Sequence, residues 1–248
     1  MKRIFLTISI ISSALVITQS CDVLNSVAGD VLGGTASTTK PSLTNDEVIS
    51  GLKEALILGI KNSVNISSVT DGFLKNDLIK LSFPEDAIKV RQKALDWGLN
   101  SQVEKFETTL NRAAEEASKE ALPIFMDAIK GMSVSDGFAI LKEGNGAATR
   151  YLKNGTTLQL TTAFSPIVKN AISKVKLTEY WTPIMNKYNG AMLITGGEKV
   201  NPDLDKYVTE KAISGLFKLV EIEEDKIRTN PIARVSDILV KVFGTVIN

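Results

Sequence analysis

Apolar residues recur at helical spacing along most of this chain, and residues typical of helix ends separate the apolar runs. Thr44 to Glu47 fits a capping box, in which the threonine hydroxyl and the glutamate carboxylate satisfy free N–H groups at a helix start. Ser101 to Glu104 fits a second capping box, while Ser133 and Asn145 are of the types that cap shorter helices. This pattern predicts a mainly α chain, with a single multi-helix domain of about eight to nine helices over residues 44–248.

Prolines and glycines predict where several of these helices begin, bend or end. Proline fits the first turn of a helix but breaks its interior, and glycine often follows the last turn. We therefore expect helix starts at Pro84, at Asn201-Pro202 and at Asn230-Pro231, an end at Gly98, and a bend or break at Pro123. Further helices are expected over residues 158–175 and 179–188. Only residues 78–83 and 192–195 resemble strands, so at most one short β-hairpin is expected.

One short sequence occurs twice in similar form. SVTDGF at residues 68–73 returns as SVSDGF at residues 133–138. The two copies could mark a duplicated helix–turn–helix unit, although a repeat architecture normally has three or more units. Serine and aspartate also satisfy free N–H groups at helix starts, and glycine eases a turn. We favour two similar helix N-caps over a duplication.

The N-terminal residues have the organisation of an export signal. The positive pair Lys2-Arg3 precedes an apolar run over residues 4–17, which is too short to cross a bilayer comfortably because spanning takes roughly 20 apolar residues. The run leads to Ser20-Cys21, which contains the only cysteine of the chain. This junction resembles the lipobox of bacterial lipoproteins, although Thr18-Gln19 departs from its usual residues. The resemblance implies cleavage before Cys21, attachment of diacylglycerol to its thiol, and acylation of the new amino terminus, for example with palmitate.

On this interpretation residues 1–20 are a signal peptide, and residues 21–43 are a lipidated cysteine with a flexible tether rich in Ser, Thr and Gly. Two alternatives remain open: a soluble secreted protein in which Cys21 is incidental, and a short ordered strand or helix around residues 23–32. The expected location is the bacterial cell envelope, on the periplasmic side or at the outer membrane. The lipid would supply the contact with the membrane, since each buried CH₂ contributes about 0.8 kcal/mol.

The residue types that are missing exclude several kinds of chemistry. The chain has no histidine, and lipidation would consume its single cysteine, which leaves no Ser-His-Asp triad, no His- or Cys-ligated metal and no disulfide. Ser50 and Lys53 match the Ser-x-x-Lys spacing of penicillin-recognising enzymes, but the companion motifs are absent and both residues fall inside an amphipathic helix. Lys and Arg total 29 against 28 Asp and Glu, so no nucleic-acid partner is indicated. We expect no cofactor and no metal, and we identify no catalytic residue.

Carboxylate chemistry needs no sequence motif and therefore stays open. The densest acidic cluster consists of Glu221, Glu223, Glu224 and Asp225. Glu224 and Arg228 are spaced i, i+4, which favours an ion pair on a helix surface over an acid/base pair or a cation site. Asn201, Asp203 and Asp205 also offer oxygen ligands, but they lack the spacing of an EF-hand loop. Helix capping is the better explanation of Asn201.

Several sequence blocks in the expected helical domain occur in the order of one known family. They include GLKEAL at residues 51–56, LNRAAE at 110–115, AATRYL at 147–152 and DLDKYVTEKA at 203–212. With shorter blocks through to KVFG near the C-terminus, they resemble the domain-of-unknown-function family 4197 of bacterial envelope proteins. Ser214, where the family often has Asp, is a small departure. The resemblance implies an exported, mainly helical domain without an established activity, so no catalytic role is transferred.

Polar residues within these otherwise apolar helical blocks are the candidate site residues. They are Asn111, Arg112, Glu115, Glu224 and Arg228. The five side chains could meet in a polar pocket, or they could brace neighbouring helices, and we favour bracing.

The favoured function is that of a non-enzymatic, lipid-anchored helical module that binds an envelope partner, either a protein or an apolar ligand. The alternative is a carboxylate-based hydrolase of an envelope glycan or peptide. It requires two acids roughly 5 to 10 Å apart that face a cleft, one of them with a raised pKa. A purely structural spacer would show neither a pocket nor a large exposed apolar patch.

Overall fold

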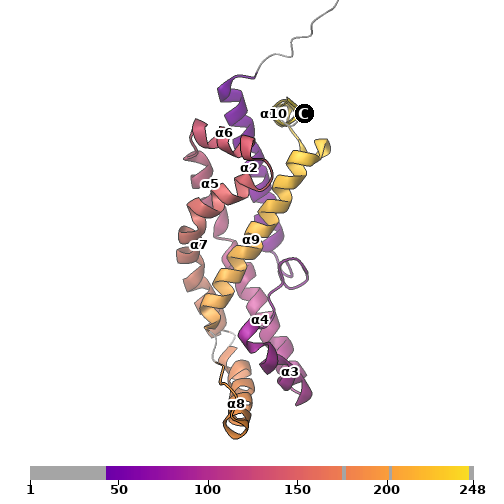
Figure 1. Ribbon diagram of the computed structural model, residues 1–248, viewed down its shortest axis with the longest axis vertical. Helices are drawn as coiled ribbons and strands as arrows, with labels where there is room; N and C mark the ends of the chain where they lie inside the picture. The colour runs from indigo at the N-terminus through magenta and orange to yellow at the C-terminus, as the bar shows by residue number, and fades with distance from the viewer. Residues whose placement is uncertain (1–42, 175–176, 201–202, 246–248) are drawn as a thin grey trace, which may run out of the picture. The chain divides into compact units, whose positions relative to one another are not determined.

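The computed structural model describes residues 43–174, 177–200 and 203–245, which belong to a unit that begins at Leu43. The expected signal peptide, Cys21 and the tether up to Ser42 lie outside the described residues, as does the expected cap at Asn201-Pro202. Every regular element in the described ranges is a helix, and no strand occurs among them, which confirms a mainly α domain (Figure 1). None of these helices combines the length and the apolar character needed to cross a bilayer.

Long helices alternate with shorter helices and two single 3₁₀ turns, η1 and η2. In chain order the elements are α2 (Asn45–Ser67), η1 (Glu85–Ala87), α3 (Ile88–Asp96), α4 (Asn100–Ser118), α5 (Ala121–Lys130), α6 (Val134–Glu143), α7 (Ala147–Lys174), α8 (Leu177–Thr195), α9 (Leu204–Thr229), η2 (Pro231–Ala233) and α10 (Asp237–Thr245).

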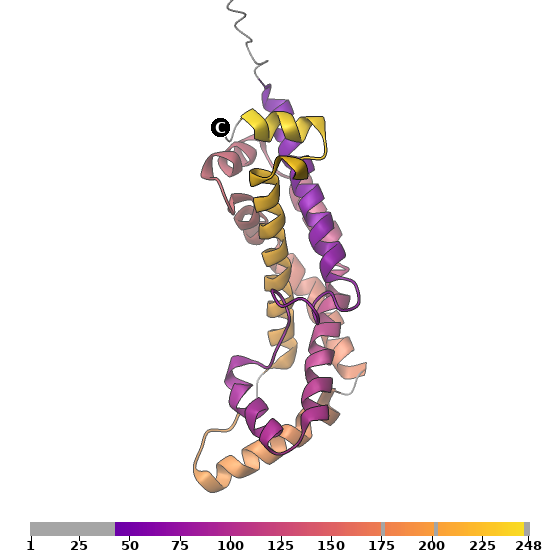
Figure 2. The same cartoon turned by 90° about the vertical axis from the view of Figure 1, so that its right-hand side faces the viewer.

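The centre of the unit is α9, and α2, α4 and α7 pack around it (Figures 1 and 2). The buried residues of α9 form a stripe much wider than that of a surface helix, as expected for a helix with neighbours on several sides. The helices α2 and α9 run in opposite directions, and α10 packs on the first half of α2 (Figure 1). At this end Lys241 Nζ of α10 donates to Glu47 Oε1 of α2 at 2.8 Å.

An aromatic cluster joins α4, α8 and the segment before η1. Phe106 of α4 stacks on Trp181 of α8 with ring centroids 4.6 Å apart, and the ring of Phe83 lies 4.4 Å from that of Phe106. All three side chains are buried. Because offset aromatic pairs add about 0.5–1.5 kcal/mol to the burial of their area, this cluster holds α8 against α4.

Several of the expected helix caps are confirmed. Thr44 Oγ1 accepts from the Glu47 N–H at 3.2 Å, and the Glu47 carboxylate accepts from the Thr44 N–H at 3.0 Å, which completes the capping box of α2. Ser133 caps α6, where Asp136 completes a second reciprocal pair. Gly98 follows α3 with φ of +78°, the left-handed conformation in which glycine ends many helices.

Other expected helix boundaries are wrong. The helix α4 begins at Asn100, so Ser101 lies inside the helix and is not its cap. The chain breaks between α4 and α5 at residues 119–120, and Pro123 follows in the first turn of α5, where its missing N–H leaves no acceptor unsatisfied. Residues 147–174 form one continuous helix where a separate helix was expected from residue 158.

Of the two Asn-Pro pairs, only Asn230-Pro231 lies within the described residues, and the structure there differs from expectation. The first described cap of α9 is Asp203, whose side chain accepts from the Lys206 N–H at 3.0 Å, and the helix begins at Leu204. The Asn230 side chain does cap the turn at Pro231, but this turn is only the 3₁₀ helix η2. The last helix, α10, starts afterwards at Asp237.

Both segments with strand-like sequence have other structures. Residues 192–195 are the last turn of α8. Residues 78–83 begin in a turn and continue as an irregular, strand-free stretch that runs beside α9 (Figure 2). Every second side chain of this stretch is buried: Ile79, Leu81 and Phe83. The alternation in the sequence is therefore real, but no neighbouring strand pairs with it in the described part of the chain.

The two copies of the repeated sequence adopt different structures. Residues 133–138 start α6 from the Ser133 cap, whereas residues 68–73 follow the end of α2. In the first copy Ser68 is the C-cap of α2, and Asp71 has φ of +69°, a left-handed conformation that aspartate tolerates better than most residues. The expected N-cap is therefore confirmed for the second copy and wrong for the first.

Candidate functional site

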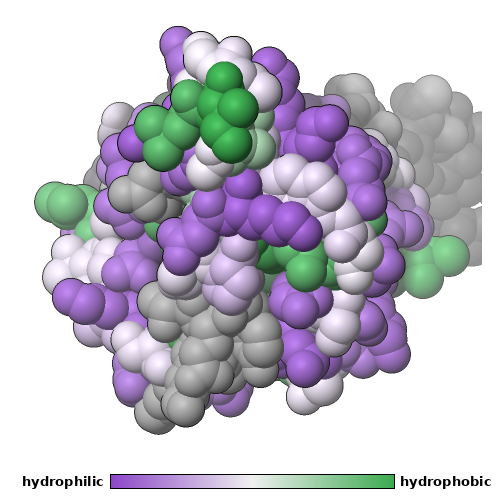
Figure 3. Space-filling view, turned by 90° about the horizontal axis from the view of Figure 1, so that it is seen from below, coloured by the Kyte–Doolittle hydropathy of each residue, from purple (hydrophilic) through white to green (hydrophobic). Residues whose placement is uncertain are grey.

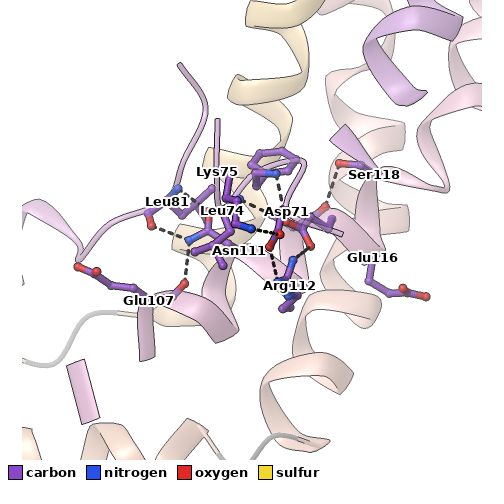
Figure 4. Close-up of polar contacts among 12 residues, drawn as sticks. Asp71, Leu74, Lys75, Leu81, Glu107, Asn111, Arg112, Glu116 and Ser118 are labelled. Atoms are coloured by element: carbon purple, nitrogen blue, oxygen red, sulfur yellow. Dashed lines mark hydrogen bonds and ion pairs between the residues drawn. The ribbon is translucent and has the colours of Figure 1, made fainter. Parts of the chain in front are cut away.

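The five candidate polar residues lie in two groups, one on α4 and one on α9, and the first member of the α4 group is Asn111. Asn111 is fully buried, and its Oδ1 accepts from the Leu81 N–H while its Nδ2 donates to the Leu81 C=O, each at 2.8 Å (Figure 4). Its Nδ2 also donates to the Glu107 C=O one turn earlier on α4, at 2.7 Å. The amide thus does for residue 81 what a neighbouring strand does in a sheet.

Arg112 and Glu115 complete the α4 group by holding the turn at residues 71–74. Arg112 donates to Glu115 Oε2 at 2.6 Å and to Asp71 Oδ1 at 2.5 Å. The other oxygen of Glu115 accepts from the backbone N–H groups of Phe73 and Leu74, at 3.1 and 3.2 Å. The left-handed residue Asp71 therefore lies in a turn whose N–H groups and carboxylate are both tied to α4.

Glu224 and Arg228 form the second group, in the interior beside the start of α7. Glu224 accepts from the N–H groups of Ala148 and Thr149 at 3.1 and 2.9 Å, and from Thr149 Oγ1 at 2.8 Å. It therefore supplies the cap of α7 that the sequence suggested for Asn145, and a carboxylate at a helix N-terminus is favoured by the helix dipole. Arg228 donates to Glu224 Oε1 at 2.9 Å and to the Ile140 C=O of α6 at 3.1 Å.

A small internal cavity lies beside the Glu224–Arg228 pair. Residues of α2, α7, α9 and α10 supply the remainder of its wall, among them Leu52, Ala148 and Phe243. Its volume is about 20 Å³. A space of this size holds about one water molecule.

The acidic cluster at residues 221–225 is spread around α9 and does not form a common site. Glu221 pairs with Lys218 at the surface at 2.8 Å. Glu223 accepts from Asn62 Nδ2 of α2 at 2.7 Å and from Lys226, while Glu224 lies against α7. Within the described residues, no group of three or more Asp, Glu, His or Cys side chains is placed to hold a metal ion.

The carboxyl groups with a clearly shifted pKa are stabilised in their charged form. Hydrogen bonds from Lys75 and then Arg112 lower the pKa of Asp71. The Ser133 hydroxyl and N–H lower the pKa of Asp136. The pKa of Glu47 falls to about 2, chiefly because Lys241 and the Thr44 N–H donate to it. These three carboxylates are therefore ionised at neutral pH and act as hydrogen-bond acceptors.

Open grooves lie on the surface of the helical unit. One runs between residues 78–88 and α9, has a volume of about 530 Å³, and includes Lys80, Ser82, Tyr207 and Lys211 in its wall; we call it the α9 groove. Others run between α4 and α7, between α7 and α9, and beside η2. Sequence reasoning missed the α9 groove, and the signal that could have located it is the alternation over residues 78–83.

The surface also carries isolated apolar side chains. Leu193 and Ile194 in the last turn of α8 are 69% and 88% exposed. Seen from this end, the surface is mostly hydrophilic, with apolar side chains gathered in a few places (Figure 3).

Lys53 of the Ser-x-x-Lys pair donates to the Lys130 C=O at 3.1 Å, so its ammonium group braces α2 against the end of α5.

Comparison with known proteins finds one family. The family model described as Protein of unknown function (DUF4197) matches residues 42–244. No curated protein and no solved structure matches the chain.

Proposed function

The chain belongs to the DUF4197 family of proteins of unknown function, and we propose that it is a non-enzymatic module that binds a partner protein in the bacterial cell envelope. The observation that supports the proposal is that the buried carboxylates already accept hydrogen bonds from groups within the fold. Acid/base catalysis needs a carboxyl group that can exchange a proton with a substrate. Glu115, Glu223 and Glu224 instead accept from backbone, amide or cationic donors within the fold.

A protein partner is supported over an apolar ligand by the small size of the cavity beside Glu224 and Arg228 and by the open form of the larger grooves. Small-molecule pockets usually measure about 300–1,000 Å³ and bury most of their ligand. The cavity beside Glu224 and Arg228 measures only about 20 Å³, whereas the surface grooves measure about 500 to 580 Å³ and are open to solvent. Open grooves of this size suit a segment of another chain better than an enclosed lipid.

The proposal includes a lipid anchor at Cys21. It is supported by the positive pair Lys2-Arg3, the apolar run over residues 4–17 and the lipobox-like Ser20-Cys21. In cells fed an alkyne analogue of palmitate, the full chain should incorporate the label and sediment with membranes. Cys21→Ser should lose both properties, and a Cys21→Ser chain that still sediments with membranes would contradict the anchor.

In-cell photo-crosslinking tests the binding function. A photo-reactive residue is placed in the full-length chain at one of three exposed positions on different helices, Lys61 of α2, Lys169 of α7 or Ser214 of α9. We expect an adduct with one defined envelope protein from at least one position, reproduced in independent cultures. Absence of a defined adduct from all three positions would overturn the proposed function.

The hydrolase alternative is tested with purified peptidoglycan. The proposed function predicts that the intact protein releases no soluble glycan or peptide fragments. Release that disappears in Glu115→Gln or Glu224→Gln would establish the hydrolase and reject the binding module. Circular dichroism of both variants shows whether the fold survives the substitution.

A further inference from the structure

We propose that the α9 groove binds an extended acidic segment of the partner protein, which adds beside residues 80–82 as a parallel β-strand. The inference rests on the proposed function and assigns to it a site and a partner chemistry. It joins three observations: a strand-free stretch whose side chains are alternately buried and exposed and whose backbone is partly unpaired, a groove beside it, and an excess of lysine around the groove.

The backbone at residues 80–82 offers one open edge. In extended chain, the N–H and C=O groups of successive residues point to opposite sides. Those of Leu81 point to α4, where Asn111 pairs with both. The Ser82 C=O points toward α9, where the Tyr207 hydroxyl donates to it at 3.2 Å and to the Phe83 C=O at 3.4 Å. By the same alternation we place the Ser82 N–H on this side.

Two backbone groups on this open edge have no partner. The Lys80 N–H donates to the Asn76 C=O at 2.8 Å, but within the described residues no group pairs with the Lys80 C=O or the Ser82 N–H. A single residue of a parallel strand can bond to both groups. Placed opposite Leu81, its N–H would donate to the Lys80 C=O and its C=O would accept from the Ser82 N–H. Asn111 and an added strand would thus pair with opposite sides of the same stretch.

The walls of the groove match alternating side chains. Leu78 and Ile88 line the groove, are 65% and 47% exposed, and offer apolar contacts to side chains of a bound strand. Gly215 lies in the wall on α9, where a Cβ would approach Ile79 to 3.1 Å, so the helix and the extended stretch are in close contact there. Added strands gain affinity from main-chain hydrogen bonds and specificity from alternate side-chain contacts.

Charge favours an acidic occupant. Lys80, Lys211 and Lys218 line the groove, and among the described residues Glu85 is the one acidic residue in its wall. Glu85 lies 3.7 Å from Lys211 but is 91% exposed, and Lys218 pairs with Glu221 at the surface. Such exposed pairs contribute little, so their lysines can turn to a bound carboxylate at small cost. A strand in which aspartate or glutamate alternates with valine or leucine fits both the lysines and the apolar rim.

Fluorescein-labelled six-residue peptides that alternate Glu or Asp with Val or Leu serve as the probe, with fluorescence anisotropy of the full chain lacking only residues 1–20 as the readout. We expect saturable binding of the acidic set. The same peptides with Lys in place of the acids, or with methylated backbone nitrogens at alternate residues, should bind about tenfold more weakly or not at all. Equal binding of all three sets would overturn the proposal.

Substitutions at Ser82 separate backbone pairing from charge attraction. Ser82→Pro removes the unpaired N–H and should weaken binding of the acidic peptide about tenfold, whereas Ser82→Ala keeps the N–H and should bind normally. Equal affinity of the two variants would reject strand addition. Thermal unfolding shows whether Ser82→Pro is folded, and the charge variants test the groove independently of it.

The charge variants are a matched pair of double substitutions. Lys211→Glu with Lys218→Glu should weaken binding at least about tenfold, because it reverses the charge of the groove. Lys61→Glu with Lys169→Glu makes the same change in net charge at exposed lysines outside the groove and should leave binding unchanged. Equal losses in both pairs, or binding only to vesicles of anionic phospholipid, would contradict a peptide site in the α9 groove.

The crosslinking experiment distinguishes failure of the site from failure of the function. A defined adduct at Lys61 or Lys169, with none at Ser214 and no peptide binding, would reject the α9 groove and leave the binding module standing. Absence of any adduct would reject the proposed function itself. An adduct at Ser214 that is lost in the Lys211→Glu, Lys218→Glu chain is the result we expect.

Discussion

At the scale of single residues, Asn111 shows how one side chain can replace a neighbouring strand. Its amide makes two bonds to Leu81 and one to Glu107, all inside the fold. Asn111→Ala would leave two buried backbone groups of Leu81 without partners, so the free energy of unfolding should fall by about 2–4 kcal/mol in urea denaturation. Asn65→Ala, on the exposed face of α2, should change it by less than about 0.5 kcal/mol. Equal effects of the two variants would contradict this role of Asn111.

Glu47 gives the stability a specific pH dependence. Its pKa falls from 4.5 to about 2 in the folded chain, chiefly through the hydrogen bond from Lys241. The ionised carboxylate therefore stabilises the fold above about pH 4.5, and this contribution is lost as the pH falls toward 2. Glu47→Gln should be less stable than the wild type at pH 6, with the difference shrinking between pH 4.5 and 2 in urea denaturation. A difference that stays constant over this range would contradict the assignment, and Lys241→Met should reduce the pH dependence in the same way.

The candidate residues could be selected from the sequence, but their partners could not. Asn111, Arg112 and Glu115 stand out because polar groups in an apolar helical block must be either exposed or satisfied. Their bonds reach residues 71–81, which are 30 or more positions away along the chain. No periodicity connects an α-helix to an irregular segment at that distance. Only the folded chain shows that these residues hold a turn and an extended stretch.

At the scale of elements, Glu224 and Arg228 join α9 to the start of α7 and the end of α6. Removing either partner leaves the other as an unpaired buried charge, so Glu224→Ala and Arg228→Ala should each lower the free energy of unfolding by about 3–5 kcal/mol. The decrease in the free energy of unfolding of the double variant should be smaller than the sum of the two single decreases, by a coupling energy of about 0.5–3 kcal/mol. Chemical denaturation of all four chains completes the cycle. Glu221→Ala, from the exposed pair with Lys218, should cost less than about 1 kcal/mol, and strict additivity at Glu224 and Arg228 would count against the brace.

Gly215 sets how closely α9 approaches the turn and extended stretch that follow α2. A Cβ there would lie 2.9 Å from Phe73 Cε1 and 3.1 Å from Ile79 Cβ. Gly215→Ala should therefore destabilise the fold by about 1–3 kcal/mol through overpacking. Gly155→Ala in α7, where no atom lies within 4 Å of the new Cβ, should stabilise it by up to about 1 kcal/mol because alanine favours the helix. Thermal unfolding of both variants provides the comparison, and a shift of the same sign in both would be inconsistent with it.

The helical character of the elements was predictable, whereas several of their boundaries were not. Thr44 and Ser133 cap their helices because their partners are only three residues away, so local sequence decides the geometry. The start of α7 depends on Glu224, which lies 75 positions away from Thr149, and local sequence pointed to Asn145 instead. Residues 78–83 have strand periodicity because one side faces the core, yet the pairing partner is a side chain of α4. The signal for burial was correct, and the signal for a sheet was not.

At the scale of the whole molecule, the described residues from Leu43 onward form a unit with its own hydrophobic core. The order of the sequence blocks predicted the family, and the family match over residues 42–244 confirms it. A chain that starts at residue 43 should unfold in one cooperative transition, with a Tm within about 2 °C of a chain that starts at residue 22. Differential scanning calorimetry checks both points. Two separate transitions, or a much lower Tm in the shorter chain, would show that the unit does not fold independently.

The pairing of α2 with α9 and α10 also orders events in time. Synthesis proceeds from the N-terminus, so α2 leaves the ribosome first of the described helices, whereas α9 and α10, which share a cavity wall with Leu52 and Leu56, are made last. Until Leu204–Thr245 has emerged, α2 has neighbours in α5 and α6 but lacks α9 and α10, and long-range contacts of this kind form slowly. A chain that terminates prematurely before α9 would leave part of the apolar side of α2 exposed to chaperones and proteases. The stable fold can therefore form only after the polypeptide has been completed.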